Sequence, residues 1–131
     1  MRRRMYEGAH REVIYKQILD SAFFVHSELG PGLLESAYEQ CLYYELSRRG
    51  LKVEKQKGMP LIFCDLKMDL GYRLDLFVEE EIIIEIKAVE ALNDVHLAQI
   101  LTYLKISGCR LGLLINFNHR HLKDGIRRVI R

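Results

Sequence analysis

Apolar side chains in the first fifty residues recur with the spacing of amphipathic helices. Across residues 10–29 they return every three or four positions, which places them on one helical face. Gly30-Pro31-Gly32 ends this pattern. A second helical pattern covers residues 34–49, and Gly50 follows where a C-terminal helix cap is expected. Two helices are therefore predicted before any strand.

Beyond the second helix the periodicity changes to that of β-strands. The segment Gly58-Met59-Pro60 and the polar stretch 65–68 are expected to punctuate these strands, because glycine, proline and polar residues interrupt the pattern. In residues 70–78 every second side chain is apolar. Arg73 and Asp75 are therefore predicted on the opposite face of that strand.

The next segment, residues 82–88, begins apolar on both faces, which indicates a strand buried between two layers. A helix is predicted after it, capped by Asn93 or Asp94 and ended by Gly108. An apolar strand at residues 111–117 follows. A strand, helix, strand succession implies a right-handed crossover to a parallel neighbour.

These segments predict a single α/β domain spanning residues 1–131 in the order ααβββαβ. Its 49% hydrophobic residues are enough for one continuous core. No element is assigned to the basic C-terminal segment. The formal charge of +2 does not by itself indicate a nucleic-acid binder. The arginines gathered at both ends are interpreted either as solvated tails or as phosphate contacts.

The cysteines are three in number and widely separated, at Cys41, Cys64 and Cys109. An odd count without a CxxC pair argues against a disulfide framework and against a zinc site. They are expected to be reduced core thiols of a cytoplasmic protein. No apolar stretch has the length of a signal peptide's core or a membrane span, so a soluble protein without membrane contact is expected.

The most informative segment for chemistry is Glu85-Ile86-Lys87, which lies in an otherwise apolar strand. Residues two apart in a strand point to the same face, so the carboxylate and the ammonium group share one side. Burying such charges costs several kcal/mol per ion unless they are paired or bind a cation. Taken alone, the segment is compatible with a local ion pair at the strand end and with a metal site.

Asp75 shifts this balance toward a metal site. It lies ten residues before Glu85 across a predicted hairpin, so the two carboxylates are expected side by side. Adjacent carboxylates both remain ionised only when a divalent cation neutralises them. Asp75, Glu85 and the carbonyl of Ile86 offer oxygen ligands suited to Mg²⁺ or Mn²⁺. Lys87 is placed to orient or help deprotonate the attacking water, which together suits phosphodiester hydrolysis.

Four sequence blocks carry a resemblance to a known family. Residues 32–38 read GLLESAY and fit the pattern GxxExxY. The others read YRLDL at 72–76, IEIKAVE at 84–90 and HLAQILTYLK at 96–105. In this order, and across about residues 14–117, they resemble the GxxExxY protein family, a branch of the PD-(D/E)XK nuclease superfamily. Leu74 stands where the superfamily's name has proline.

The resemblance implies a restriction-endonuclease-like fold, in which a mixed sheet is flanked by helices. It assigns Asp75, Glu85 and Lys87 to the D…ExK core. It further implies that Glu35, on the first catalytic helix, completes the metal shell. Gln99 and Tyr103 match the QxxxY element, and their spacing of four puts both on one helical face. From there they would contact the lysine, a water or a phosphate.

Three functions follow as hypotheses. The leading one is a Mg²⁺- or Mn²⁺-dependent nuclease that acts on DNA, with RNA left open. The second is a catalytically inactive nucleic-acid or protein interaction module that retains the fold, because fold alone does not assign activity. The third is a structural homodimer whose polar cluster only holds the core. A homodimer is also expected for the nuclease, because a small domain offers little surface for gripping a duplex.

Overall fold

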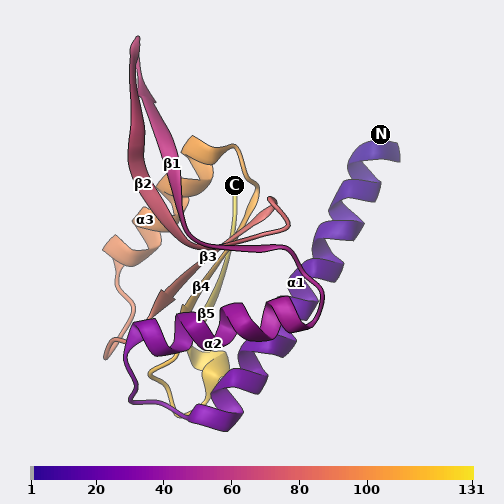
Figure 1. Ribbon diagram of the computed structural model, residues 1–131, viewed down its shortest axis with the longest axis vertical. Coiled ribbons are helices and arrows are strands. Elements are labelled where there is room, and N and C mark those ends of the chain that lie inside the picture. Colours follow the sequence, from indigo (N-terminus) through magenta and orange to yellow (C-terminus); the bar gives the residue numbers. More distant parts are fainter. Residues whose placement is uncertain (1) are drawn as a thin grey trace.

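The computed structural model describes the backbone of residues 2–131 and the side chains from Gly8 onward. Its elements are α1 (Arg2–Leu29), α2 (Glu35–Arg48), β1 (Val53–Phe63), β2 (Leu66–Val78), β3 (Ile82–Lys87), α3 (Asp94–Ser107), β4 (Leu111–Asn116), the 3₁₀-helix η1 (Leu122–Gly125) and β5 (Ile126–Ile130). This is the predicted order ααβββαβ with one further strand at its end (Figure 1). The α/β class is confirmed.

The five strands form one mixed sheet in the order β1-β2-β3-β4-β5. β3 and β4 pair in parallel, and the other neighbours are antiparallel. The predicted parallel pairing across α3 is confirmed, and β3 is buried except at its last residue. Among the described residues, none of the helices combines the length and apolarity that a membrane span requires.

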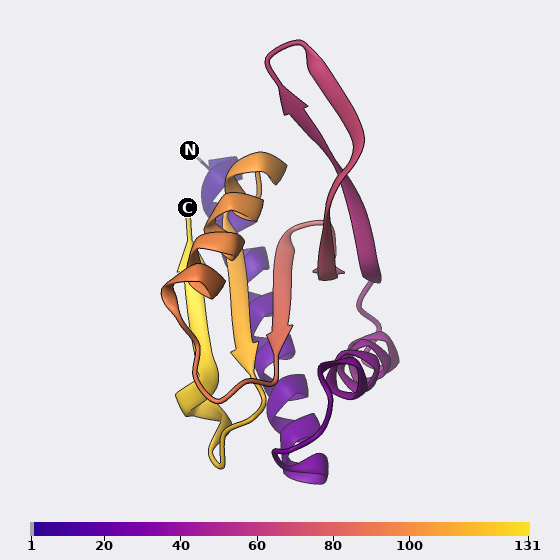
Figure 2. The same cartoon turned by 90° about the vertical axis from the view of Figure 1, so that its left-hand side faces the viewer.

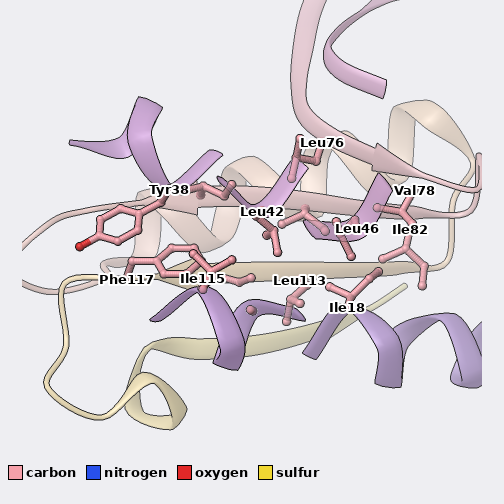
Figure 3. Packing of buried hydrophobic residues seen from close by; sticks show 14 of the residues in the cluster. Ile18, Tyr38, Leu42, Leu46, Leu76, Val78, Ile82, Leu113, Ile115 and Phe117 are labelled. Carbon is pink, nitrogen blue, oxygen red and sulfur yellow. The ribbon is translucent and has the colours of Figure 1, made fainter. Parts of the chain in front are cut away.

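Helices cover both faces of the sheet (Figure 2). α1 and α2 pack on one face, where Ile18, Leu42 and Leu46 meet the inward side chains of β2, β3 and β4 (Figure 3). On the other face, Ile100 and Leu104 of α3 form a second core cluster with the sheet. Burying apolar side chains from both sides fixes the sheet as the central layer.

The two ends of α3 are determined by the local sequence. Asn93 is its N-cap, and its side chain accepts the backbone N–H of His96 while the His96 ring accepts the N–H of Asn93. This reciprocal pair satisfies two helix-end donors. Gly108 ends the helix in the left-handed conformation with φ of 78°, as predicted.

Tyr38 joins the two N-terminal helices to the core. Its ring is buried and stacks on Phe117, with ring centroids 4.6 Å apart. Its hydroxyl donates to the carbonyl of Gly30 at 2.6 Å and accepts the N–H of Leu33 at 3.1 Å. The tyrosine of GxxExxY thus fastens the loop that precedes α2.

Replacing Tyr38 with phenylalanine is expected to lower the free energy of unfolding by about 1–2 kcal/mol, because two hydrogen bonds are lost while the ring packing remains. Urea unfolding followed by circular dichroism measures this change. Tyr44→Phe, at an exposed tyrosine on the same helix, serves as the control and should stay within roughly 0.5 kcal/mol of the wild type. Equal stability of the two variants would contradict the role given to the Tyr38 hydroxyl.

The single apolar face expected for β2 is wrong. Leu74 packs in the cluster on the α3 side, whereas Leu76 packs in the cluster beneath α1 and α2. The strand therefore changes face at Asp75. Gln56 lies opposite on β1 and has a φ of 52°, in the left-handed region that is rare for residues other than glycine. The irregular backbone of β1 and the change of face in β2 thus lie side by side.

Gly58-Met59-Pro60 does not separate strands as expected. β1 continues through it, and only the pairing register with β2 shifts there, since proline has no N–H to donate. Gly71 allows the strands to come close, because a Cβ at that position would lie 2.2 Å from the Cβ of Leu61. The hairpin then continues to a turn at Cys64. This cysteine is exposed, so its expected place in the core is wrong.

The basic C-terminal segment forms β5 at the edge of the sheet, against β4. Only Val129 of this strand is buried, which explains why no apolar pattern revealed it. Arg128 is not a free tail, because it forms an ion pair with Glu12 and lies over the ring of Tyr15. The side chains of residues 2–4 lie outside the described residues.

Candidate active site

The strands β2 and β3 separate where the two candidate carboxylates lie. Their pairing ends at Leu76 opposite Ile84. Beyond this point the side chains replace the main-chain ladder: Glu85 accepts the N–H of Asp75 at 2.9 Å, and Asp75 accepts the N–H of Ile86 at 2.8 Å. The structure thus brings Asp75 and Glu85 together at a fork in the sheet.

This carboxylate pair is electrostatically strained in the absence of a cation. Burial raises the pKa of Asp75, and the Ile86 N–H and the Lys87 charge offset this only in part. Burial, and secondly the neighbouring Asp75, raise the pKa of Glu85 to about 8. Near neutral pH the metal-free pair therefore retains a proton, since two close carboxylates in a poorly solvated place disfavour double ionisation.

Lys87 follows at the end of β3 and faces α3. Its ammonium group donates to the side-chain oxygen of Gln99 at 3.3 Å. One turn further along α3, Tyr103 stacks on Tyr72 with ring centroids 4.8 Å apart. Burial raises the pKa of Tyr103, and the charges of Glu85 and Asp75 raise it further. The QxxxY element therefore lies beside the lysine and the two carboxylates.

Glu35 reaches the same region from the first turn of α2. Its carboxylate accepts the N–H of Ala88, directly after β3, at 3.1 Å. A cavity of about 270 Å³ opens between α2 and the fork. Its lining consists of Glu35, Ser36, Glu39, Gln56, Asp75 and Ile86.

Three residues of this cavity, Ser36, Glu39 and Gln56, were not identified as site residues from the sequence. Gln56 donates from its amide nitrogen to Glu39 at 2.5 Å and to Asp75 at 3.4 Å. Burial raises the pKa of Glu39. The spacing of four from Glu35 would have placed Glu39 on the same side of α2. No sequence pattern indicated that Gln56 lies in the site, because its side chain is placed there by the left-handed backbone of β1 at this residue.

Asn116 supports the chain beyond the site from the end of β4. It is fully buried, and its side-chain amide accepts the N–H of Val89 at 3.1 Å and donates to the carbonyl of Val89 at 2.9 Å. The N–H of Phe117 also donates to the carbonyl of Lys87 at 2.9 Å. These bonds fix the strand end that carries the lysine.

The donor set fits a hard divalent cation, because it consists of carboxylate and carbonyl oxygens without sulfur or imidazole. Asp75, Glu85 and the carbonyl of Ile86 would hold such an ion, and Glu35 lies on the facing helix. Among the side chains described from Gly8 onward, no three His, Cys, Asp or Glu residues are grouped closely enough to bind a metal by themselves. Main-chain or water oxygens would therefore complete the coordination.

A mixed sheet flanked by helices, with Asp, Glu and Lys at a fork between two strands, defines a nuclease-like α/β domain. Residues 12–129 match the family model of the PD-(D/E)XK nuclease superfamily. The match covers most of the chain, which therefore belongs to this superfamily. No curated protein and no solved structure gives a match.

Proposed function

We propose that this protein is a Mg²⁺- or Mn²⁺-dependent nuclease that hydrolyses phosphodiester bonds of DNA. Membership of the PD-(D/E)XK nuclease superfamily supports nuclease chemistry on a nucleic acid. The observation that carries the proposal is the reciprocal pair of hydrogen bonds that holds Asp75 and Glu85 at the fork. Two carboxylates this close in a poorly solvated place are costly when both are ionised, and a bound divalent cation would remove that cost.

The roles of the residues follow from their positions. A divalent cation bound by Asp75, Glu85 and the Ile86 carbonyl, with Glu35 completing its ligands, would polarise the phosphoryl group and offset its developing charge. Lys87 orients the attacking water with its ammonium group. Glu85 is buried, and charges interact more strongly in such a place than in bulk water.

The QxxxY residues have a positioning role in this proposal. Gln99 accepts a hydrogen bond from Lys87 and so limits the directions in which the ammonium group can point. Tyr103 is fixed by its stack on Tyr72. Its hydroxyl and the amide of Gln99 are the groups proposed to contact a phosphate or the water.

Three finer assignments belong to the same proposal. The chain is placed in the GxxExxY branch on its four sequence blocks, and Glu35 and Tyr38 support this because each holds the structure around the first helix pair. A cytoplasmic location is proposed from the widely separated free cysteines. A homodimer is proposed because two-fold assemblies are common for domains of this size.

A DNA- or protein-binding module without catalysis is the second candidate. The observation that favours it is the bond of Glu35 to Ala88, which occupies one oxygen of the carboxylate expected to complete the metal shell. A protein that binds DNA without cutting it would tolerate this arrangement.

Titration of Mn²⁺ into the metal-free protein separates the two candidates. Wild-type protein should bind Mn²⁺ and cut a mixture of DNA substrates. Asp75→Asn keeps the shape of the side chain but removes its charge, so it should weaken Mn²⁺ binding by at least about tenfold and abolish cleavage. Isothermal calorimetry and a gel assay measure the two effects.

Asp20→Asn is the matched control, because Asp20 is exposed on α1 and lies outside the site. It should bind Mn²⁺ and cut DNA as the wild type does. Wild-type protein that binds DNA but neither binds Mn²⁺ nor cuts would refute the nuclease and favour the interaction module.

A further inference from the structure

The outer part of the β1–β2 hairpin stands away from the body of the protein (Figures 1 and 2). β2 pairs with β3 only over residues 76–78, so the hairpin beyond the site has no third strand beside it. An isolated two-stranded hairpin is marginally stable in water. Residues 61–70, here called the arm tip, lie beyond the register shift and the close approach at Gly71.

The arm tip exposes a large amount of apolar surface. Its exposed large side chains are Ile62, Phe63, Leu66, Met68 and Leu70, each between 44% and 69% accessible. Phe63 pairs with Leu66, and Leu61 with Met68, so these four side chains share one face of the hairpin. Contiguous apolar surface of this kind marks an interaction site.

The charge of the arm tip indicates which kind of partner it fits. Lys67 is its only basic residue, and Asp65 and Asp69 are acidic. A surface that binds nucleic acid needs several lysines or arginines against the phosphates. The arm tip is therefore better suited to an apolar protein surface.

The same chain carries an apolar groove in the other half of the molecule. The groove lies between the C-terminal half of α1 and α2 and has a volume of about 420 Å³. Its lining is largely apolar and includes Phe24, Leu29, Cys41 and Tyr44, of which all but Cys41 are exposed. Its charged residues are Glu28, Glu45 and Arg48, and Arg48 is already paired with Glu45.

We propose that the arm tip of one copy of this chain docks in the groove of a second copy, and that the second copy returns the same contact. The chemistry of the two surfaces matches, because the apolar face of the tip meets an apolar lining. The charges also match at one point, because Lys67 of the arm tip is available for Glu28 of the groove.

The placement of the two surfaces favours a closed pair. The arm tip forms one end of the long axis, and α2 with the C-terminal half of α1 lies in the other half of the molecule (Figure 1). Two antiparallel copies can therefore each present an arm tip to the other's groove. A two-fold arrangement uses both surfaces twice and leaves neither open, whereas a one-way contact would build fibres.

Two native cysteines allow the proposed contact to be tested by disulfide cross-linking. Cys64 is exposed at the turn of the arm tip, and Cys41 lines the groove. They lie in opposite halves of one copy, so a disulfide between them can form only between two copies. Mild oxidation of the full chain with diamide should give a cross-linked dimer on non-reducing gels. Mass spectrometry should identify a Cys41–Cys64 disulfide in it.

Single substitutions separate the possible contacts. Cys41→Ser and Cys64→Ser should each abolish this cross-link, and Cys109→Ser should leave it intact. A Cys64–Cys64 disulfide that survives Cys41→Ser would show that tips meet tips, and would overturn docking in the groove.

The assembly itself is measured by light scattering after size exclusion. Wild-type protein should be a dimer, and Phe63→Asp with Leu66→Asp should be a monomer, because charges in the interface oppose burial. Tyr44→Asp, which alters the groove and leaves the arm tip unchanged, should also give a monomer. Circular dichroism should show the same helix and strand content in all three proteins.

Two results would overturn the proposal. One is a wild-type monomer at concentrations of tens of micromolar. The other is an arm-tip variant that loses DNA binding while the mass of the particle is unchanged, which would assign the arm tip to nucleic acid. A wild-type monomer would also remove the homodimer proposed above, on which this inference rests, but neither result bears on whether Asp75 and Glu85 bind a metal.

Discussion

Lys87→Met is expected to lower the rate of metal-dependent DNA cleavage by about 10²–10⁴-fold, the range that a positioned proton-transfer group contributes. The ammonium group lies near Asp75 and Glu85, and Gln99 fixes its direction. Methionine has a similar length and no charge, so packing is retained. Single-turnover cleavage of a labelled duplex measures the rate.

The same variant tests which step the lysine serves. Lys87 is not among the proposed metal ligands, so calorimetry should show Mn²⁺ binding to Lys87→Met within severalfold of the wild type. Lys105→Met is the matched control, because Lys105 is exposed on α3, and it should cut at the wild-type rate. Cleavage by Lys87→Met at the wild-type rate would remove the lysine from the mechanism.

The metal-free protein is expected to become less stable as the pH rises from about 4.5 to 8. The pKa of Glu85 is raised to about 8 by burial and by Asp75, from an ordinary value of 4.5. The folded state therefore favours the protonated carboxyl, and the unfolded state releases the proton at lower pH. Stability is fully present below the unfolded pKa and falls as the pH rises toward the folded one. Each pKa unit is worth 1.36 kcal/mol, so the loss by pH 8 is roughly 4 kcal/mol.

Glu85→Gln should remove most of this pH dependence, because glutamine accepts the Asp75 N–H without a charge. Urea unfolding with a chelator present, at several pH values between 4.5 and 8, gives the slopes to compare. Glu90→Gln, at an exposed glutamate beyond β3, should keep the wild-type slope. Adding Mn²⁺ at pH 8 should restore stability to the wild type, since an ion that binds only the folded state stabilises it. Parallel slopes for wild type and Glu85→Gln would locate the titrating group elsewhere.

The parts of the fold that were predicted from sequence are those with a strong local period. The face formed by Ile14, Ile18, Ala22 and Val25 predicted α1, and these side chains are all buried against the sheet. β3 was recognised because it is apolar on both sides. Such patterns arise directly from burial, so a single stretch of sequence contains them.

The remaining parts depend on contacts between distant segments. β5 has a single buried residue, Val129, and is held by pairing with β4. The change of face in β2 lies opposite Gln56 of β1, whose left-handed backbone has no signal in the sequence. Gly58-Met59-Pro60 has the composition of a turn, yet its partner strand accommodates it through a register shift.

The candidate site was predictable only in part for the same reason. Alternation within β3 put Glu85 and Lys87 on one side, and the family resemblance added Glu35, Gln99 and Tyr103. The spacing of four from Glu35 could have indicated Glu39, but nothing in the sequence indicated Gln56, whose hydrogen bond to Glu39 joins β1 to α2 across seventeen residues. It took the three-dimensional arrangement to place them in the cavity beside Asp75.

The residues at the fork between β2 and β3 are under two different kinds of selection, for folding and for catalysis. Asp75 and Glu85 accept backbone N–H groups that a continuous ladder would otherwise pair, so they also hold the sheet together. A lineage that abandoned cleavage would still be selected to keep a hydrogen-bond acceptor at both positions for folding. The Lys87 side chain bonds to the side chain of Gln99 and not to the main chain. Without selection for catalysis, this position could therefore change to other residues. Among related chains, retention of the lysine is therefore a sharper sign of present-day catalysis than retention of the acids.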